Sequence, residues 1–336
     1  MDPEPPLLVI AGPTAVGKTA VALAVARRAS GEIVSADSRT VYRGLDIGTS
    51  KPSPADLEAV PHHLIDVADP GDIFTLADYQ RLAAARVAEI CRRGRMALLV
   101  GGTGLYIRAV VDGLSIPVAK PDWVLRAHLE EEERLGGAGT LHRRLAVVDA
   151  DAAARIHPHN VRRVIRALEV YHRTGMPISA LQRGVPPRLA PAADGSGQAR
   201  CAGPVPSAQH VPRRTVMVAL TLDRGILYER IDRRIDEQLA SGLIDEVRRL
   251  LDLGYSPDLP SLQGLGYKEL VPYVAGRMTL GEAIARLRRD TRRYAKRQWT
   301  WFRADARYRW IDAGRPPEVV AAEISAMMER ESPSTT

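Results

Sequence analysis

The feature that most constrains this chain is a glycine-rich run near its start: Gly12, Pro13, Thr14, Ala15, Val16, Gly17, Lys18 and Thr19. The run matches the pattern G-x-x-x-x-G-K-[ST] and lies between a short apolar strand predicted at 7–11 and a helix predicted at 19–29. In such a turn, backbone N–H groups and the helix N-terminus surround phosphate oxygens. Lys18 adds a full positive charge, and the Thr19 hydroxyl can ligate Mg²⁺. We therefore expect this phosphate loop (residues 12–19) to bind a phosphorylated ligand, whose identity the motif leaves open.

Strand-like runs alternate with helical patterns along much of the chain. Further strands are predicted at 33–36, 96–100 and 216–222, and an amphipathic helix with Ile231 and Ile235 on one face follows the last of them. Alternation of this kind predicts a parallel sheet with helices on both faces. We therefore expect an α/β fold whose core is like that of the P-loop NTPases, with an all-helical insertion domain added to it.

The chain divides into segments of different character. Residues 123 to 181 contain no convincing strand and predict several helices, residues 184–213 are rich in Pro, Gly, Ala and Ser, and residues 281–310 are strongly basic with a helical pattern. The predicted order is the first part of the core (1–118), a helical insertion (119–183), a loop (184–213), the completion of the core with basic helices (214–315), and a C-terminal helix with a frayed tail (316–336).

The composition favours an anionic partner without naming it. The 336 residues carry a formal net charge of +7, which suits nucleic acid or another polyanion. A GC-rich genome explains an Arg-rich chain equally well. The two cysteines, Cys91 and Cys201, lack the spacing of a disulfide framework or metal site. The N-terminal residues do not resemble a signal peptide, and no apolar run reaches the ~20 residues of a membrane span, so we expect a cytoplasmic protein without membrane contact.

Two polar residues follow predicted strands at the edge of the sheet that carries the phosphate loop. Asp37 follows the strand at 33–36, and Thr103 follows the strand at 96–100 within the run Gly101-Gly102-Thr103-Gly104. Ligands of open α/β sheets bind outside the carboxyl ends of the strands. Asp37 could therefore accept a proton from a nucleophile beside the phosphate loop. An Asx-type turn explains Asp37 equally well, and an ordinary turn explains the glycines.

Several further motifs make the sequence specific. In chain order they are Ser35-Ala36-Asp37-Ser38, Tyr42-Arg43-Gly44-Leu45-Asp46-Ile47-Gly48-Thr49, His62-His63-Leu64-Ile65-Asp66, Ile156-His157-Pro158, Arg162-Arg163-x-x-Arg166-Ala167-Leu168-Glu169, Gln263-x-x-Gly266-Tyr267-Lys268-Glu269 and Tyr294-Ala295-Lys296-Arg297-Gln298-x-Thr300-Trp301. Together with the phosphate loop, they resemble the tRNA dimethylallyltransferase family over residues 7–302, apart from the loop 184–213.

The resemblance implies a reaction and a set of catalytic residues. The phosphate loop would bind dimethylallyl diphosphate rather than ATP, with Mg²⁺ as the cofactor and Thr19 as its protein ligand. Asp37 would be the base for the exocyclic N6 amine of the adenosine that follows the anticodon of tRNA, as that amine attacks the allylic carbon and diphosphate leaves. Thr103 would contact the leaving oxygen. Arg230 and Arg234, one helical turn apart, resemble the diphosphate-binding arginines of the family, and the sequence does not separate their roles.

The resemblance also implies that the anticodon stem-loop of tRNA is the macromolecular partner, and we expect the enzyme to be a monomer. An adenine in that loop must leave its stack to reach a buried carboxylate. The residues predicted to contact tRNA are Ser38, Arg39, Thr40, Arg162, Arg163, Arg166, Gln263, Gly266, Tyr267, Lys268, Arg293, Lys296, Arg297, Gln298 and Trp301. The family often has Gln where this chain has Thr40, so a base contact at that position does not carry over with the motif.

The basic segment after residue 281 and the paired histidines each allow two interpretations. Arginines and lysines alternate with aromatic residues between 286 and 303, a pattern that suits phosphate contacts and base stacking. A solvated basic face with its aromatic residues packed inward explains the same pattern. His62 and His63 lack the further ligands of a zinc site, so we expect structural roles for them.

Three other functions fit parts of the pattern. A small-molecule or nucleoside kinase has the same phosphate loop, but it leaves the basic C-terminal segment unexplained. A free-adenylate isopentenyltransferase shares the prenyl chemistry, but it has no use for the helical insertion. A tRNA-binding module whose phosphate loop only senses a ligand predicts that Asp37→Ala changes affinity alone. Stabilisation by ATP or by dimethylallyl diphosphate separates the kinase from the transferase.

Overall fold

The computed structural model describes residues 6–117, 121–183 and 214–330. The predicted loop 184–213 lies outside these residues. Contacts within the chain separate two compact units, which we describe one at a time. The sheet unit comprises the described residues of 1–74, 78–112 and 208–336, and the helical unit comprises 75–77 and the described residues of 113–207.

The sheet unit is built on one parallel sheet. Its described strands lie in the order β3-β2-β4-β1-β5-β6, and their bounds are β1 Leu7–Ala11, β2 Glu32–Ser35, β3 His62–His63, β4 Ala97–Gly101, β5 Thr215–Thr221 and β6 Arg309–Asp312. In the central strand, Ile10 lies opposite Val100 of β4 and Val218 of β5. Because every pair is parallel, the carboxyl ends of all the strands meet at one edge of the sheet, where α/β proteins bind their ligands. The predicted α/β fold class is confirmed.

The sequence predicted four strands to within one residue and missed the two at the edges of the sheet. β3 has only two residues, and the pairing of Ile33 with His62 places it beside β2. The prediction that 281–310 is helical throughout is wrong at its end, because Trp310 lies in β6 opposite Ala219. Edge strands like these depend on a partner far away in the sequence, which local residue patterns do not reveal.

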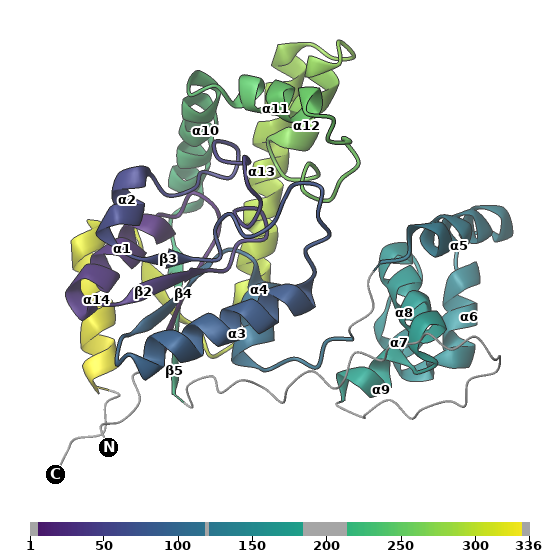
Figure 1. Cartoon of the computed structure of the whole chain (residues 1–336), viewed down its shortest axis with the longest axis horizontal. Coiled ribbons are helices and arrows are strands. Elements are labelled where there is room, and N and C mark those ends of the chain that lie inside the picture. The colour runs from purple at the N-terminus through teal and green to yellow at the C-terminus, as the bar shows by residue number, and fades with distance from the viewer. Residues whose placement is uncertain (1–5, 118–120, 184–213, 331–336) are drawn as a thin grey trace. The chain divides into compact units, whose positions relative to one another are not determined.

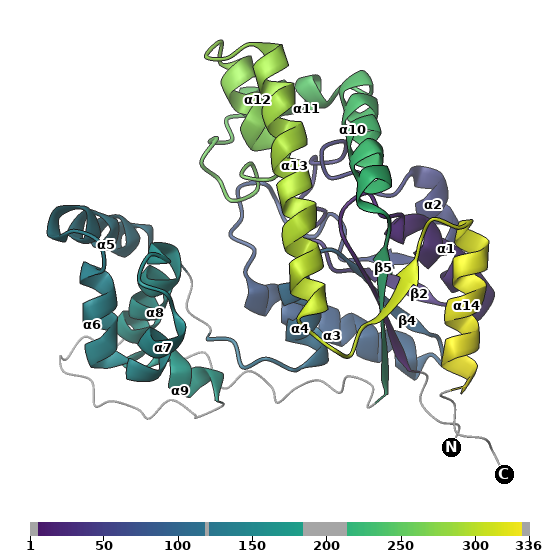
Figure 2. The same ribbon diagram turned by 180° about the vertical axis from the view of Figure 1, so that it is seen from behind.

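Helices cover both faces of the sheet. α1 (Lys18–Ala29) and α14 (Pro317–Arg330) pack together on one side, and α3 (Leu76–Arg92) and α4 (Gly104–Val111) lie on the other (Figures 1 and 2). Strand residues such as Leu8 share one apolar core with α1 and α14. On the other face, Tyr79 of α3 is fully buried and donates a hydrogen bond to the Ser35 carbonyl oxygen at 3.0 Å. Because helices bury both faces of the sheet, a binding site can form from the loops at the carboxyl ends of the strands.

A second apolar core supports the loops that follow β2. Its helices are α10 (Arg224–Ala240), α11 (Leu243–Asp252), α12 (Tyr267–Val274) and α13 (Leu280–Arg303), and the short helix α2 (Pro54–Ala59) precedes β3. Leu243 and Leu270 pack in this core with Leu45 of the loop after β2. α13 begins with a capping box, in which Thr279 and Glu282 exchange hydrogen bonds between side chain and backbone.

The helical unit contains α5 (Trp123–Gly136), α6 (Thr140–Val148), α7 (Ala150–Arg155), α8 (Val161–Thr174) and α9 (Ile178–Gln182). Its apolar core includes Leu129, Leu145 and Leu168. Glu169 of α8 is fully buried and accepts hydrogen bonds from Arg126 at 2.8 Å and from Arg166 at 2.6 Å. Burial raises the pKa of Glu169, but the arginines and a backbone N–H group outweigh that effect and lower it. The carboxylate therefore stays charged inside the unit, with its partners in place.

Candidate active site

The phosphate loop connects β1 to α1 and closes on itself through Lys18. Gly12 has φ of 145°, and a Cβ atom there would lie 2.8 Å from the Leu220 carbonyl oxygen, so the loop requires glycine at this position. Lys18 Nζ donates hydrogen bonds to the carbonyl oxygens of Gly12 at 3.0 Å and Pro13 at 2.8 Å. The side chain of Lys18 thus lies across the loop, with its charge at the mouth of the turn.

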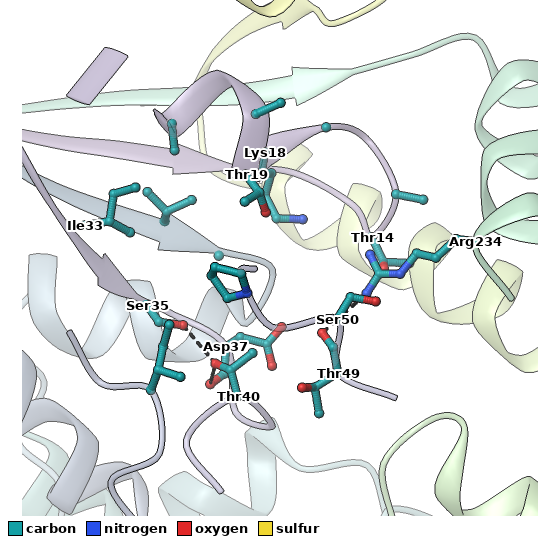
Figure 3. Close-up of a pocket in the computed structure, with 18 of the residues that line it drawn as sticks. Thr14, Lys18, Thr19, Ile33, Ser35, Asp37, Thr40, Thr49, Ser50 and Arg234 are labelled. Carbon is teal, nitrogen blue, oxygen red and sulfur yellow. Dashed lines mark hydrogen bonds between the residues drawn. The ribbon is translucent and has the colours of Figure 1, made fainter. Parts of the chain in front are cut away.

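A cavity of about 480 Å³ opens beside the phosphate loop at the carboxyl ends of β2 and β4. Figure 3 shows Lys18, Asp37 and Arg234 directed at the same space from α1, the end of β2 and α10. Thr19 and Arg230 also line it. The apolar part of the wall includes side chains from β2, β4 and the segment after β3: Ile33, Ile65 and Val100. One cavity therefore offers cationic groups, a carboxylate and an apolar surface to a ligand.

The charges in this cavity act on one another. Burial lowers the pKa of Lys18 to about 8, and nearby Asp37 partly opposes that shift. Burial likewise lowers the pKa of Arg234, against the opposing charges of Asp37 and Glu237. Within the described part of the chain, neither cation forms an ion pair with a carboxylate. Holding cations together in a partly buried site costs free energy, which an anionic ligand would offset.

Asp37 forms a local turn and also lies in the cavity. Its Oδ1 accepts a hydrogen bond from the Arg39 backbone N–H at 2.8 Å, as in an Asx-type turn. The residue also lines the cavity, so its carboxylate faces ligand space as well as the turn. Thr103 lies at the N-terminus of α4, where its Oγ1 accepts a hydrogen bond from the Ser38 N–H at 3.1 Å. Thr103 thereby ties the end of β4 to the segment that carries Asp37.

The loop 46–50 forms another part of the cavity wall and is held from two helices. Glu246 of α11 accepts hydrogen bonds from the backbone N–H groups of Asp46, Ile47 and Gly48 at 2.8 to 3.1 Å. Gln238 of α10 donates to carbonyl oxygens of the same loop at 2.8 and 3.0 Å. These contacts position Thr49 and Ser50, which line the cavity. The sequence analysis missed this arrangement, because Glu246 lies some 200 residues from the loop that it holds.

α13 contributes Tyr294 and Gln298, one helical turn apart, to the same cavity. Burial together with nearby Asp37 raises the pKa of Tyr294 to about 12, so the phenol stays protonated at neutral pH. Tyr294 was not among the predicted site residues. Its spacing of four from Gln298 is the one sequence signal that places both side chains on the same face of the helix.

Comparisons with known proteins agree with this geometry. The family model described as "IPP transferase" matches residues 40–305. The chain belongs to the IPP transferase family. A tRNA dimethylallyltransferase of Roseiflexus sp. (strain RS-1) is 52% identical over 89% of this chain and 90% of the relative. Another tRNA dimethylallyltransferase, from Desulforudis audaxviator, is 48% identical over 98% of this chain and 100% of the relative.

A solved structure supports the same membership. The full-length tRNA isopentenylpyrophosphate transferase of Bacillus halodurans is 40% identical to this chain, with a TM-score of 0.66 and 97% of each chain covered. The resemblance inferred from the motifs is thus confirmed, and this IPP transferase family member is a prenyltransferase that acts in tRNA modification. No helix in the described residues is long and apolar enough to cross a membrane.

The residues predicted to contact tRNA fall into two groups. Those with exposed side chains are Arg162, Arg163, Gln263, Lys268, Arg293, Lys296, Arg297 and Trp301. Ser38 and Arg39 are half-buried beside Asp37, and the Arg39 guanidinium donates to the Pro260 carbonyl oxygen. Arg166 is half-buried in its ion pair with Glu169. The exposed group is available to a macromolecular partner, whereas Arg166 already serves the helical unit.

Four residues predicted to contact tRNA are buried, and two of them, Thr40 and Gln298, line the cavity. Tyr267 is fully buried and donates a hydrogen bond to Glu246 at 2.7 Å, so its side chain belongs to the core and not to a tRNA-facing surface. Gly266 is buried before it, at the start of α12. Thr40 is 7% exposed and shares a hydrogen bond of 2.9 Å with Ser35. Gln298 is 6% exposed and bonds to loops of this chain. Motif membership alone did not reveal which way these side chains point.

The basic segment of α13 contains arginines paired within the chain and basic side chains exposed to solvent. Arg288 and Arg292 pair with Asp236 and Asp232 and join α13 to α10. The exposed row of Arg293, Lys296 and Arg297 lies elsewhere on the helix. Trp299 is half-buried and donates to Thr221 at 3.2 Å, as expected of a packed aromatic residue, whereas Trp301 is 37% exposed.

The cavity fits a magnesium ion that arrives with a phosphorylated ligand. Among the described residues, no group of three or more carboxylate, imidazole or thiol side chains could hold a metal by itself. Mg²⁺ usually binds through one or two protein oxygens together with phosphate oxygens and water. The Thr19 hydroxyl, which lines the cavity, is an oxygen of this kind. The histidines have structural contacts: His63 bonds to Glu32 at 2.7 Å, and His62 bonds to the Val60 carbonyl oxygen at 2.7 Å.

Proposed function

We propose that this enzyme transfers a dimethylallyl group from dimethylallyl diphosphate to the N6 amine of the adenosine that follows the anticodon of tRNA. The observation that carries the proposal is the cavity at the carboxyl ends of β2 and β4. There Lys18, Arg230 and Arg234 lie across from Asp37, beside an apolar wall. A diphosphate matches the cations, and a five-carbon chain matches the apolar wall.

The chemistry assigns a separate task to each part of the cavity. The N6 amine forms a bond to the allylic carbon while the bond from that carbon to the diphosphate oxygen breaks, and the oxygen keeps the electron pair. An aryl amine is a weak nucleophile, so its proton must leave as the new bond forms, and Asp37 is placed to accept it. Lys18, Arg230 and Arg234 stabilise the negative charge of the leaving diphosphate. Mg²⁺, held by Thr19 and the diphosphate, would neutralise part of that charge when bound.

Thr103 and Tyr294 complete the proposed site from β4 and α13. In the structure, the Thr103 hydroxyl accepts a hydrogen bond at 3.1 Å from the N–H of Ser38, the residue that follows Asp37. The proposal assigns it a contact to the leaving oxygen. The phenol of Tyr294 stays neutral at the pH of the reaction, because its pKa is raised to about 12. It can therefore donate a hydrogen bond without adding a negative charge near the diphosphate.

We propose that tRNA binds through its anticodon stem-loop to the exposed basic residues of the sheet unit and of α8. The target adenine must turn out of the loop stack to reach Asp37, which costs a few kcal/mol and is offset by backbone contacts. We further propose that the enzyme works as a monomer in the cytoplasm.

The test is transfer of radiolabelled dimethylallyl diphosphate to unmodified tRNA, with AMP as the alternative acceptor. The proposal predicts label on the adenosine beside the anticodon and none on AMP. Label on AMP would assign the enzyme to free-adenylate prenylation. In parallel, thermal stabilisation by dimethylallyl diphosphate with Mg²⁺ is compared with stabilisation by ATP, because a ligand at 100 times its Kd adds about 2.7 kcal/mol. Stabilisation by ATP alone, without transfer, would support a kinase and contradict the proposal.

A further inference from the structure

One buried side chain joins the two loops that frame the cavity. Gln298 of α13 accepts a hydrogen bond on Oε1 from the Thr14 N–H at 2.9 Å, and its Nε2 donates to the Gly102 carbonyl oxygen at 2.8 Å. Thr14 lies in the phosphate loop after β1, and Gly102 lies in the turn after β4. Since β1 and β4 are neighbours in the sheet, the amide of Gln298 bridges the ends of two adjacent strands.

The packing around this amide leaves little room for another arrangement. Gln298 is only 6% exposed, and a Cβ atom at Gly102 would lie 2.2 Å from its Nε2. The glycine is therefore required for the amide to approach the turn. Both polar atoms of the amide are used, as expected of a buried polar side chain. A side chain of different length or polarity would leave the Thr14 N–H or the Gly102 carbonyl without its partner.

The phosphate loop has a strained point next to this contact. Ala15, the residue after Thr14, has φ of 63°, a left-handed conformation that residues other than glycine adopt rarely. Such conformations persist where surrounding contacts hold them, and they concentrate at binding sites. The hydrogen bond from Thr14 to Gln298 is a contact of this kind, made from outside the loop. The shape of the loop therefore depends on a residue 284 positions away in the sequence.

We infer that Gln298 is a positioning residue: it holds the phosphate loop and the turn after β4 in the geometry that binds the diphosphate of the donor. The inference rests on the proposed function and assigns Gln298 a task different from direct contact with tRNA. Gln298 also lines the cavity, together with Lys18, Asp37 and Tyr294. Its effect on the reaction passes through the loop that it holds.

The first test compares Gln298→Met with a control on the same helix. Methionine keeps the length and volume of the side chain and removes both hydrogen bonds. We expect the KM for dimethylallyl diphosphate to rise about tenfold and kcat to fall, with the Kd for an anticodon stem-loop changed less than twofold. Thr300→Ala alters an exposed residue whose hydroxyl bonds to the Lys296 carbonyl oxygen of its own helix, and it should match the wild type in all three quantities. A Gln298→Met variant that loses thermal stability but keeps its KM and kcat would overturn the inference.

The second test uses Gln298→Glu, because a neutral carboxylic acid can both donate and accept as the amide does. Donor binding is measured by thermal stabilisation with dimethylallyl diphosphate, so it does not depend on turnover. The ratio of donor affinity in the variant to that in the wild type should rise as pH falls and the introduced carboxyl group is protonated. Lys18 titrates in both proteins, so the ratio removes the contribution that the two proteins share. A ratio that stays constant with pH would contradict the inference, whereas absence of transfer in the wild type would contradict the proposed function alone.

Discussion

The helical unit and the cavity of the sheet unit differ in how their charged side chains are paired. In the helical unit, the fully buried Glu169 is surrounded by Arg126, Arg166 and a backbone N–H group, so its charge is matched within the protein. In the cavity, Lys18 lies near Asp37, and Arg234 lies near Asp37 and Glu237, without an ion pair in the described residues, and burial lowers the pKa of each cation. The paired charges of the helical unit hold its fold together. The cations of the cavity lower the stability of the protein, but they remain available to bind a ligand.

A basic composition predicts less about the function of a region than does the pairing of its basic side chains with carboxylates. Both regions are rich in arginine, and the net charge of +7 does not separate them. The structure separates them, because it shows which guanidinium groups already have carboxylate partners. The predictions that follow test whether paired charges govern stability and unmatched charges govern ligand binding.

We expect the largest loss of stability when the buried carboxylate of the helical unit is removed. Glu169→Ala leaves two arginines without their shared partner and should lower the free energy of unfolding by about 3 kcal/mol, measured by urea denaturation. The matched control is Asp151→Ala, which breaks the exposed ion pair to Arg183 and should cost less than about 1 kcal/mol. Equal losses of unfolding free energy in the two variants would contradict the distinction between buried and exposed ion pairs.

The next effect concerns donor binding. Arg234→Ala should raise the Kd for dimethylallyl diphosphate about 10- to 100-fold, because a charge-assisted hydrogen bond contributes about 1.5–3 kcal/mol, while the unfolding free energy changes little. Isothermal titration calorimetry measures the Kd. Arg233→Ala is the control, because Arg233 is exposed on the same helix and does not line the cavity. If both variants bind the donor as the wild type does, Arg234 does not serve the diphosphate.

A smaller effect is the dependence of donor binding on pH. Burial lowers the pKa of Lys18 to about 8 in the free enzyme, so the ammonium group is charged below that pH and loses its proton above it. A bound diphosphate favours the charged form and raises this pKa. The Kd for the donor should therefore increase as pH rises above 8, by up to about tenfold per pH unit. A Kd that is flat between pH 7 and pH 10 would contradict the role of Lys18.

The smallest effects belong to the exposed basic row of α13. Removing Lys296 or Arg297 singly should weaken binding of an anticodon stem-loop several-fold and reduce the slope of log Kd against log salt by about one unit at most. Arg307→Ala is the control, because Arg307 is already paired with Asp305 and Asp112. If Arg307→Ala reduced the slope of log Kd against log salt by a similar amount, then pairing with a carboxylate would not determine which cations contact the RNA.

The sequence predicted the sheet and its ligand-binding edge because both depend on local patterns. Apolar runs of five to seven residues marked β1, β4 and β5, and the phosphate loop marked the edge where Asp37 also lies. Family motifs then added a role for Thr103 and pointed to the two arginines of α10. What remained hidden depends on partners distant in the sequence: the edge strands β3 and β6, the support of loop 46–50 by Glu246, and the bridge made by Gln298. Tyr267 shows the same limit, because its motif is recognisable while the direction of its side chain is not.

The most direct test of the account is single-turnover transfer to unmodified tRNA by Asp37→Asn and Asp37→Ala at saturating donor. Asparagine keeps an oxygen that can accept from the Arg39 N–H group, so the first variant removes the base and preserves the turn. The account predicts that both variants transfer about 10²- to 10⁴-fold more slowly than the wild type, with the Kd for dimethylallyl diphosphate changed less than about threefold. A rate within tenfold of the wild type would contradict it, because the proton of the N6 amine would then leave without Asp37.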